Sequence, residues 1–173
     1  SSQIGGNIGT NAGGIKVIRY GMTRQWIMGL TVVTGKGDIL QLNRGMVKNA
    51  TGYDLRQLFI GSEGTLGLVT HAQIKLERQP QDLNVMILNM DSFNDVMNVL
   101  SAFQAKIDLT AFEFFDDVAI DKLMAHGQVQ EPFESRTKFY TLLEFDAPYE
   151  PIMDNAMAIF EECMEQGWVV DGV

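Results

Sequence analysis

The sequence has one cysteine, two histidines and no long apolar run, and each shortage excludes a class of protein. The single thiol, Cys163, excludes a disulfide within the chain, and it is either a small core residue or a group with a chemical role. Without a cysteine pair or acidic residues at metal-ligand spacing, no zinc or iron signature is present. No window reaches the roughly 18 apolar residues of a membrane helix, and no signal peptide opens the chain. These absences predict a soluble, cytoplasmic protein without a membrane span.

Charge and glycine content both divide the chain near residue 80. Residues 1–80 carry nine Lys or Arg against four Asp or Glu, whereas residues 81–173 carry four against eighteen. Fourteen of the seventeen glycines lie at or before Gly67. The first part therefore suits an anionic ligand, and the acidic second part excludes a nucleic acid partner. We predict two structural units, 1–79 and 80–173, with the 46% hydrophobic content typical of globular domains.

The first unit is predicted to consist of loops and strands with little helix. The segment 1–14 holds five glycines and is expected to be a loop without an apolar face. The runs 27–34 and 39–42 flank a glycine-containing turn and predict a hairpin. Asp54 can cap a short helix over 55–60, and a strand is expected over 68–76.

The second unit alternates strands and helices. Strands are expected over 84–90, 110–115 and 138–145, helices over 92–106, 117–126 and 151–166, and a last apolar run covers 168–170. Apolar residues recur at helical spacing in the first and third of these helices, and Asp91 or Ser92 caps the first. This alternation predicts an α+β unit with helices packed on one face of a sheet.

Two glycine clusters, 5–14 and 61–67, are the strongest indication of a site. Glycine-rich backbone can turn its N–H groups toward an oxygen-rich anion, but the same residues also suit tight turns. Neither cluster is a Gly-x-x-x-x-Gly-Lys-Ser/Thr phosphate loop. Neither is a strand-to-helix Gly-x-Gly-x-x-Gly with an acid about 20 residues later, so a Rossmann site is excluded as well.

Five segments together resemble one family of flavoproteins. They are Ile4-Gly5-Gly6-Asn7, Thr10-Asn11-Ala12-Gly13-Gly14, Arg19-Tyr20-Gly21, Thr51-Gly52-Tyr53-Asp54-Leu55 and Gly61-Ser62-Glu63-Gly64-Thr65-Leu66-Gly67-Leu68-Val69-Thr70. In this order they resemble the FAD-linked oxidases, which have a PCMH-type FAD-binding domain and include D-lactate dehydrogenase and the glycolate oxidase flavin subunit. Three later segments, 111–116, 139–144 and 169–172, look most like the D-2-hydroxyglutarate dehydrogenase branch of that family.

The resemblance implies an α+β chain in which 1–79 is the second half of the FAD-binding domain. It implies that 80–173 begins a ferredoxin-like cap or substrate domain. The first cluster would run past the flavin ring and pyrophosphate, largely through main chain, and the second would close on the ribityl and adenosine side. The residues expected at FAD are Ile4, Gly5, Gly6, Asn7, Thr10, Asn11, Gly13, Gly14, Glu63, Gly64, Gly67 and Val69. Asn11 could equally satisfy its own turn, and Glu63 could equally cap the local backbone.

No catalytic residue and no metal ligand is expected within the chain. By resemblance, the catalytic and metal-ligand histidines follow the segment that ends at Val173, and the first phosphate-binding loop precedes Ser1. We therefore expect a piece of the middle third of such an enzyme, excised from a longer protein. In this piece alone, FAD binding should be weak or absent.

The remaining charged residues suit structural roles. His71 is expected to turn outward from its strand, and His126 suits the negative end of a helix. Asp116 is expected to cap a helix. Lys16 and Arg19 would either supply positive potential near a phosphate or remain solvated.

The resemblance implies oxidation of a D-2-hydroxyacid, D-2-hydroxyglutarate or D-lactate, by hydride transfer to FAD. Electrons would then pass to an acceptor that the sequence does not identify. The rival hypothesis is a flavin-free structural module. In that case incomplete sheet edges would pair two copies of the chain into a homodimer.

Overall fold

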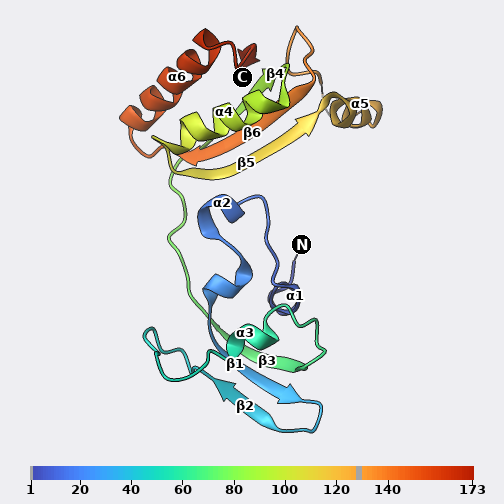
Figure 1. Cartoon of the computed structure of the whole chain (residues 1–173), viewed down its shortest axis with the longest axis vertical. Coiled ribbons are helices and arrows are strands. Elements are labelled where there is room, and N and C mark those ends of the chain that lie inside the picture. Colours follow the sequence, from blue (N-terminus) through green and yellow to red (C-terminus); the bar gives the residue numbers. More distant parts are fainter. Residues whose placement is uncertain (1, 128–129) are drawn as a thin grey trace. The chain divides into compact units, whose positions relative to one another are not determined.

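The structure is a computed structural model in which residues 2–127 and 130–173 are described. This part of the chain forms two compact units (Figure 1). The first unit consists of the segment up to Gly14 with Gly21–Arg78, and the second consists of Ile15–Tyr20 with Gln79–Val173. The chain therefore passes from one unit to the other three times. Within the described ranges no helix is long and apolar enough to cross a membrane.

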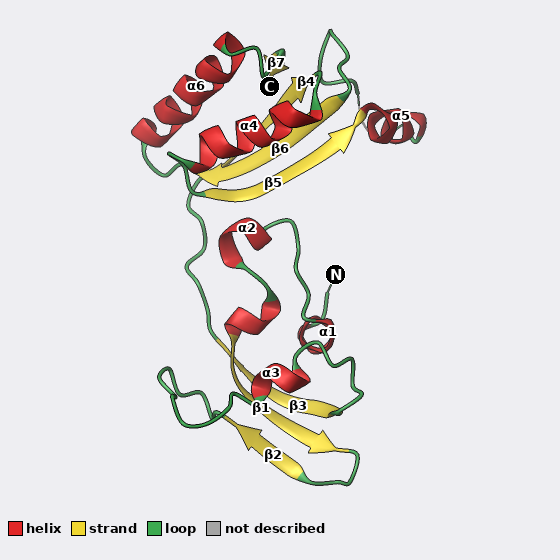
Figure 2. Cartoon of the chain, viewed as in Figure 1, coloured by secondary structure: helices red, strands yellow, loops and turns green. Residues whose placement is uncertain are grey.

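The first unit is built on a three-stranded antiparallel sheet. Its strands are β1 (Ile27–Thr34), β2 (Ile39–Leu42) and β3 (Gly67–Ile74), in the order β2-β1-β3 (Figure 2). Its helical segments are α1 (Ile4–Thr10), a 3-10 turn η1 (Thr23–Trp26) and α3 (Arg56–Phe59). Ile8 of α1 and Phe59 of α3 pack against Leu30 and Val32 of β1 to form the core. The predicted hairpin of β1 and β2 is confirmed at the expected residues.

The sequence predicts a loop over 1–14, and this is wrong for Ile4–Thr10, which form helix α1. Three of the seven residues of α1 are glycine, so its intrinsic helix propensity is low. The segment nevertheless has an apolar anchor, because Ile8 is only 1% exposed. Tertiary burial of that one side chain stabilises a helix that composition alone does not favour.

The second unit is a ferredoxin-like α+β fold. Its strands are β4 (Leu83–Met90), β5 (Leu109–Asp116), β6 (Phe139–Asp146) and β7 (Asp171–Gly172), in the order β5-β6-β4-β7. Its helices are α2 (Val17–Tyr20), α4 (Phe93–Gln104), α5 (Asp117–Ala125) and α6 (Glu150–Glu165). Strand β6 lies between β5 and β4 and pairs antiparallel with both. Strand β4 also pairs antiparallel with β7. Two strand-helix-strand units are thus interleaved, as the predicted fold class requires.

Helices α4 and α6 cover one face of this sheet (Figure 1). Their apolar stripes meet alternate residues of β4 and β6, including Leu88, Leu143 and Phe145, all fully buried. Cys163 of α6 is fully buried in the same cluster, and burial raises the pKa of its thiol to about 11. Of the two interpretations of Cys163, the structure supports the core residue.

The predicted elements of the second unit match the observed ones to within two residues at each end. Ser92 caps α4 by accepting the N–H of Asn94, and Asp116 caps α5 by accepting the N–H of Ala119 at 2.9 Å. The last apolar run, 168–170, precedes strand β7 and is not part of it. A Cβ at position 172 would lie 2.6 Å from the ring of Phe160, so close packing there requires glycine.

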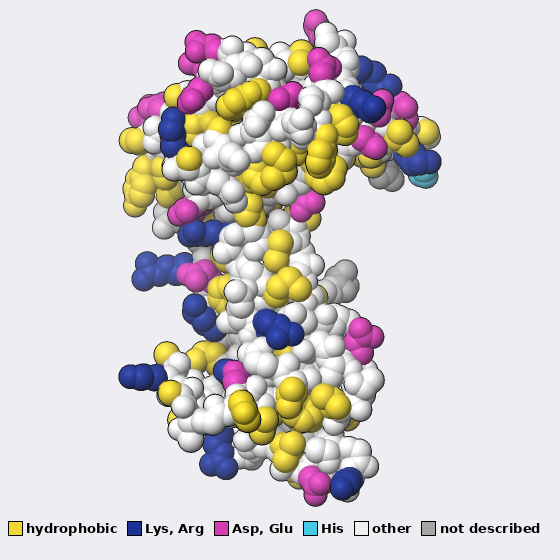
Figure 3. Space-filling view, in the orientation of Figure 1, with side chains coloured by type: hydrophobic (Ala, Val, Ile, Leu, Met, Phe, Trp, Pro, Cys, Tyr) yellow, Lys and Arg dark blue, Asp and Glu magenta, His cyan; other side chains and the backbone are white. Residues whose placement is uncertain are grey.

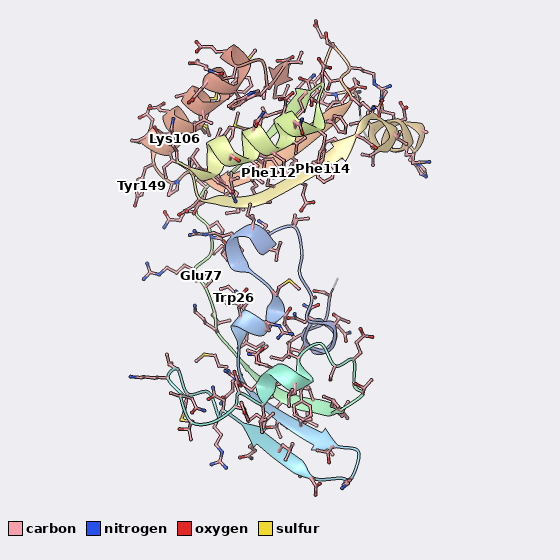
Figure 4. The ribbon with its side chains drawn as sticks, viewed as in Figure 1. Trp26, Glu77, Lys106, Phe112, Phe114 and Tyr149 are labelled. Atoms are coloured by element: carbon pink, nitrogen blue, oxygen red, sulfur yellow. The ribbon has the colours of Figure 1, made fainter. Side chains whose placement is uncertain are left out.

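Part of the α4 and β5 surface is apolar and exposed (Figure 3). Phe93 of α4 meets Phe114 of β5 edge to face, with ring centroids 5.3 Å apart. Phe114 lies two residues from Phe112 along the same strand (Figure 4). These rings extend the core of the second unit toward solvent at the outer strand of the sheet.

Thr141 on β6 generates a prediction about stability. It is fully buried, and its hydroxyl has no hydrogen-bond partner among the described residues. An unpaired buried hydroxyl destabilises a fold, so Thr141→Val should raise the free energy of unfolding by about 1 kcal/mol. Urea unfolding followed by circular dichroism measures the change.

Thr110→Val is the matched control for this substitution. Thr110 is 2% exposed, but its hydroxyl donates to Glu144 Oε1 at 2.6 Å. Removing that donor should lower the free energy of unfolding. A Thr141→Val protein that is less stable than the wild type would contradict the assignment of an unpaired hydroxyl.

Candidate functional site

The two predicted glycine clusters meet in the first unit. The N–H groups of Gly61 and Glu63 donate to the carbonyl oxygens of Ile8 and Gly9, each at 2.9 Å. These bonds join the loop after α3 to the last turn of α1. Residues far apart in the sequence thereby form one surface of the first unit, made mostly of backbone.

Most glycines of this surface face open space. A Cβ added at Gly5, Gly6 or Gly9 of α1 would meet no atom within 4 Å, and the same holds for Gly14 and Gly64. Packing within the chain therefore does not require glycine at these five positions, although the φ of 79° at Gly64 favours glycine there. Their common property is an uncovered main chain that a flat or anionic ligand could approach closely.

The side chains of α1 add local order and an apolar edge. Ile4 is 54% exposed at the start of the helix. The Thr10 hydroxyl donates to the carbonyl oxygen of Gly6 at 3.0 Å, and the Asn7 amide donates to the Ser2 hydroxyl at 3.3 Å. Thr10 and Asn7 keep acceptor capacity beyond these bonds, because each uses only a donor in them.

Asn11 ends α1 in the left-handed conformation, with φ 51° and ψ 52°, which asparagine adopts more readily than most residues. Its Oδ1 accepts the N–H of Arg24 at 3.0 Å, so the Asn11 side chain binds backbone 13 residues away and not its own turn. The Arg24 guanidinium donates to Gln57 Oε1 and to the carbonyl oxygen of Ile60. Sequence analysis missed Arg24 because these partners lie 13 to 36 residues away.

The second cluster divides into two kinds of position. Glu63 and Gly64 have φ values of 51° and 79° and are exposed in the loop beside α1. Gly67 opens β3, where a Cβ would lie 2.7 Å from the carbonyl oxygen of Val33, so close strand packing explains this glycine. Val69 is half-buried against the core of the first unit. Gly13, like Gly14, lies in the exposed loop that follows α1.

His71 lies outside this surface, on the three-stranded sheet. His71 is exposed, as expected, and its Nδ1 lies 3.1 Å from the Thr70 hydroxyl. His71 and Arg44 contribute to a groove of about 610 Å³ on the three-stranded sheet. The rest of its lining is Gly29, Leu30, Thr31, Gln41, Leu42, Ala72 and Gln73, and so includes no residue expected at FAD. No cluster of three metal-ligating side chains occurs within 2–127 and 130–173.

Two family models match the chain. Residues 79–173 match the family described as FAD linked oxidases, C-terminal domain. Residues 1–43 match the FAD binding domain. The match to the FAD binding domain contains α1 and the residues that follow it, and the match to the C-terminal domain contains the ferredoxin-like sheet.

Curated relatives match the chain over almost its whole length. It is 63% identical over 173 residues to D-2-hydroxyglutarate dehydrogenase of Stutzerimonas stutzeri, covering 100% of this chain and 37% of the relative. It is 37% identical over 175 residues to the mitochondrial D-2-hydroxyglutarate dehydrogenase of Danio rerio, covering 99% and 33%. Glycolate oxidase subunit GlcD of Bacillus subtilis is 36% identical over 152 residues, covering 87% and 32%. The chain thus spans about a third of the length of these relatives.

Solved structures share the fold at low identity. An alkyldihydroxyacetonephosphate synthase matches with a TM-score of 0.70 at 17% identity, over 98% of this chain and 34% of that one. p-Cresol methylhydroxylase matches with a TM-score of 0.62 at 14% identity, over 90% and 35%. Identities this low support the fold alone.

The distinction between open and packed glycines predicts opposite effects of alanine. Gly6→Ala should leave the fold intact and raise the free energy of unfolding by about 0.5–1 kcal/mol, because alanine is the better helix former. Gly67→Ala should lower it, since the added Cβ would press against β1. Thermal unfolding of the two variants tests the pair, and equal destabilisation by both would contradict the distinction.

Proposed function

Because the chain belongs to the family of FAD-linked oxidases, we propose that the complete protein is a FAD-dependent dehydrogenase of D-2-hydroxyacids. D-2-hydroxyglutarate is the first candidate substrate and D-lactate the second. The names of the relatives at 63% and 37% identity favour D-2-hydroxyglutarate. Bound FAD would accept a hydride from the substrate α-carbon, and a separate acceptor would take up the electrons.

The observation that carries this proposal is the meeting of α1 with the loop 61–64. The flavin ring of FAD is flat and the pyrophosphate of FAD is anionic, so the ring and the pyrophosphate both favour exposed backbone over bulky side chains. The surface formed by Gly5, Gly6 and Gly64 has this character. The exposed Ile4 beside it could cover an apolar ring edge.

We assign direct FAD contact to the exposed members of the expected set and to the half-buried Asn7 of α1, and packing roles to the others. Ile4, Gly5, Gly6, Asn7, Thr10, Gly13, Gly14, Glu63 and Gly64 form the direct group. Asn11, Gly67 and Val69 would act by shaping that surface, because their contacts are with the chain itself. No catalytic residue is assigned within 2–127 or 130–173.

For the 173-residue chain alone we propose weak or absent FAD binding and no dehydrogenase turnover. It spans about a third of the relatives' length, and FAD in such proteins contacts more than one segment. The cytoplasm remains our proposed location, although the Danio rerio relative carries the word mitochondrial in its name.

A direct test uses the complete protein. The purified protein should carry FAD, and D-2-hydroxyglutarate should bleach the flavin absorbance under anaerobic conditions. Gly6→Leu should weaken FAD binding by about tenfold or more, because a side chain would occupy the backbone surface. Flavin fluorescence during titration of the apoprotein measures the dissociation constant.

Gly35→Leu is the matched control. Gly35 also faces open space, but it lies in the turn between β1 and β2, outside the expected FAD residues. The Gly35→Leu substitution should leave the FAD dissociation constant unchanged. A complete protein that binds no flavin would exclude the proposed activity, and equal losses in the two variants would exclude the assigned surface.

We also propose that the isolated chain pairs with a second copy through its sheet edges. β2 and β3 are the outer strands of the first sheet and each pairs on one side only among the described residues. Open edges of this kind pair with other strands. Light scattering should give a mass that rises with concentration, and a constant monomer mass would exclude this pairing.

A further inference from the structure

The 3-10 turn η1, in which Figure 4 labels Trp26, is hydrogen-bonded to the end of α1 within the first unit. The N–H and the hydroxyl of Thr23 both donate to the carbonyl oxygen of Ala12, at 3.0 and 2.8 Å. The N–H of Arg24 donates to Asn11 Oδ1 at 3.0 Å. These bonds fix the residues that directly follow α1, and none of them uses the Arg24 side chain.

The Arg24 guanidinium extends from this turn to the second glycine cluster. Its Nη1 donates to Gln57 Oε1 at 3.1 Å, and its Nη2 donates to the carbonyl oxygen of Ile60 at 3.3 Å. Gln57 belongs to α3, and Ile60 directly precedes Gly61, where the second cluster begins. A Cβ built at Gly61 would lie 3.8 Å from Arg24 Nη2. One side chain therefore connects η1, and with it the end of α1, to the loop after α3.

Helix α3 lies beside α1 (Figure 1), and α3 and the loop after it depend on tertiary contacts for their position. α3 has only four residues, too few for a stable isolated helix. Phe59 and Ile60 anchor its end in the core of the first unit. The loop beyond them is largely exposed and meets α1 through the N–H groups of Gly61 and Glu63. The Arg24 guanidinium adds a side-chain contact where this loop begins.

A second arginine, Arg56, holds α3 through other partners. Its guanidinium pairs with Asp54 at 2.6 Å, and its Nη1 also donates to the carbonyl oxygens of two residues of β1, each at 2.7 Å. Both acceptors of the Arg24 guanidinium are uncharged, and among the described residues no carboxylate forms an ion pair with Arg24. Arg56 thus ties α3 to β1, whereas Arg24 ties it to η1 and the end of α1.

We propose that Arg24 is a positioning residue for FAD. Its guanidinium holds the loop 61–64 beside the end of α1, so that both glycine clusters present their exposed backbone on one surface. Without this contact, FAD binding would have to order the loop, and the affinity for FAD would fall. Arg24 acts through Gln57 and the main chain of Ile60 and does not itself contact FAD. This inference rests on the proposed function, and every residue that carries it belongs to the first unit.

The first measurement needs no FAD. Hydrogen exchange, followed by mass spectrometry on the complete apoprotein, compares the wild type with Arg24→Met. Peptides that cover 4–12 and 58–66 should exchange about threefold faster in the variant, because loss of the Arg24 contact weakens the bonds between the loop and α1. Arg56→Met is the matched control. It removes the other arginine that binds α3 and should leave exchange over 4–12 unchanged.

The second measurement is the FAD dissociation constant of the complete protein, with the visible circular dichroism of the bound flavin. Arg24→Met should weaken FAD binding by about tenfold and alter the flavin dichroism. Gln57→Met removes one of the two acceptors and should weaken binding by about threefold, and the double variant should lose no more than Arg24→Met alone. Arg24→Lys should recover little affinity, because one ammonium group does not reproduce the planar fork of a guanidinium.

The outcomes separate this proposal from the proposed function. If the wild type binds FAD and Arg24→Met binds it equally tightly, the positioning role is excluded and the proposed function stands. Full affinity in Arg24→Lys also excludes the role, because attraction between a positive charge and the pyrophosphate would then explain the residue. Equal losses of FAD affinity in Arg24→Met and Arg56→Met exclude it as well.

A variant that fails to fold does not block the test. If Arg24→Met does not fold, Gln57→Met decides, and an unchanged dissociation constant with unchanged exchange over 58–66 excludes the positioning role. A complete wild-type protein that binds no FAD overturns both the proposed function and the positioning role.

Discussion

The burial of Ile8 is the contact on which the candidate site depends. Its side chain is 1% exposed against the three-stranded sheet, and it holds in place a helix that contains three glycines. Its carbonyl oxygen accepts the N–H of Gly61, which joins the second glycine cluster to the first. A single apolar residue therefore orders a segment whose other members leave their backbone uncovered.

Glycine occurs at positions of the first unit for two different physical reasons. At Gly67 a Cβ would collide with β1, so the fold itself requires the missing side chain. At Gly5 and Gly6 an added Cβ would meet no neighbouring atom, so packing within the chain does not explain these glycines, whereas the φ of 79° at Gly64 itself favours glycine. A glycine-rich composition combines these cases, and only the surroundings of each residue separate them.

The second unit combines a regular fold with one irregular feature. Its interleaved strands and helices bury a continuous core that includes Leu88 and Cys163. The bulge at Thr110 interrupts the regular ladder of β5 next to Glu144, where a buried hydroxyl and a lysine meet one carboxylate. The two basic residues that the sequence left as solvated or phosphate-facing are both engaged in ion pairs here. β-Bulges often re-aim a side chain in this way.

The sequence by itself determined the strands other than β7, the three long helices of the second unit and the family. Apolar periodicity places β1 and β2 at their observed residues, because local side-chain patterns decide which faces can be buried. Only the tertiary structure decided that residues 4–10 are helical, that Gly61 meets Ile8, and that Lys16 pairs with a carboxylate 128 positions away. Each of these contacts joins residues distant in sequence, and no local pattern encodes them. The twelve expected FAD residues remain a prediction from family resemblance, and the fold leaves open backbone at Gly5, Gly6 and Gly14 but packs Gly67 against β1.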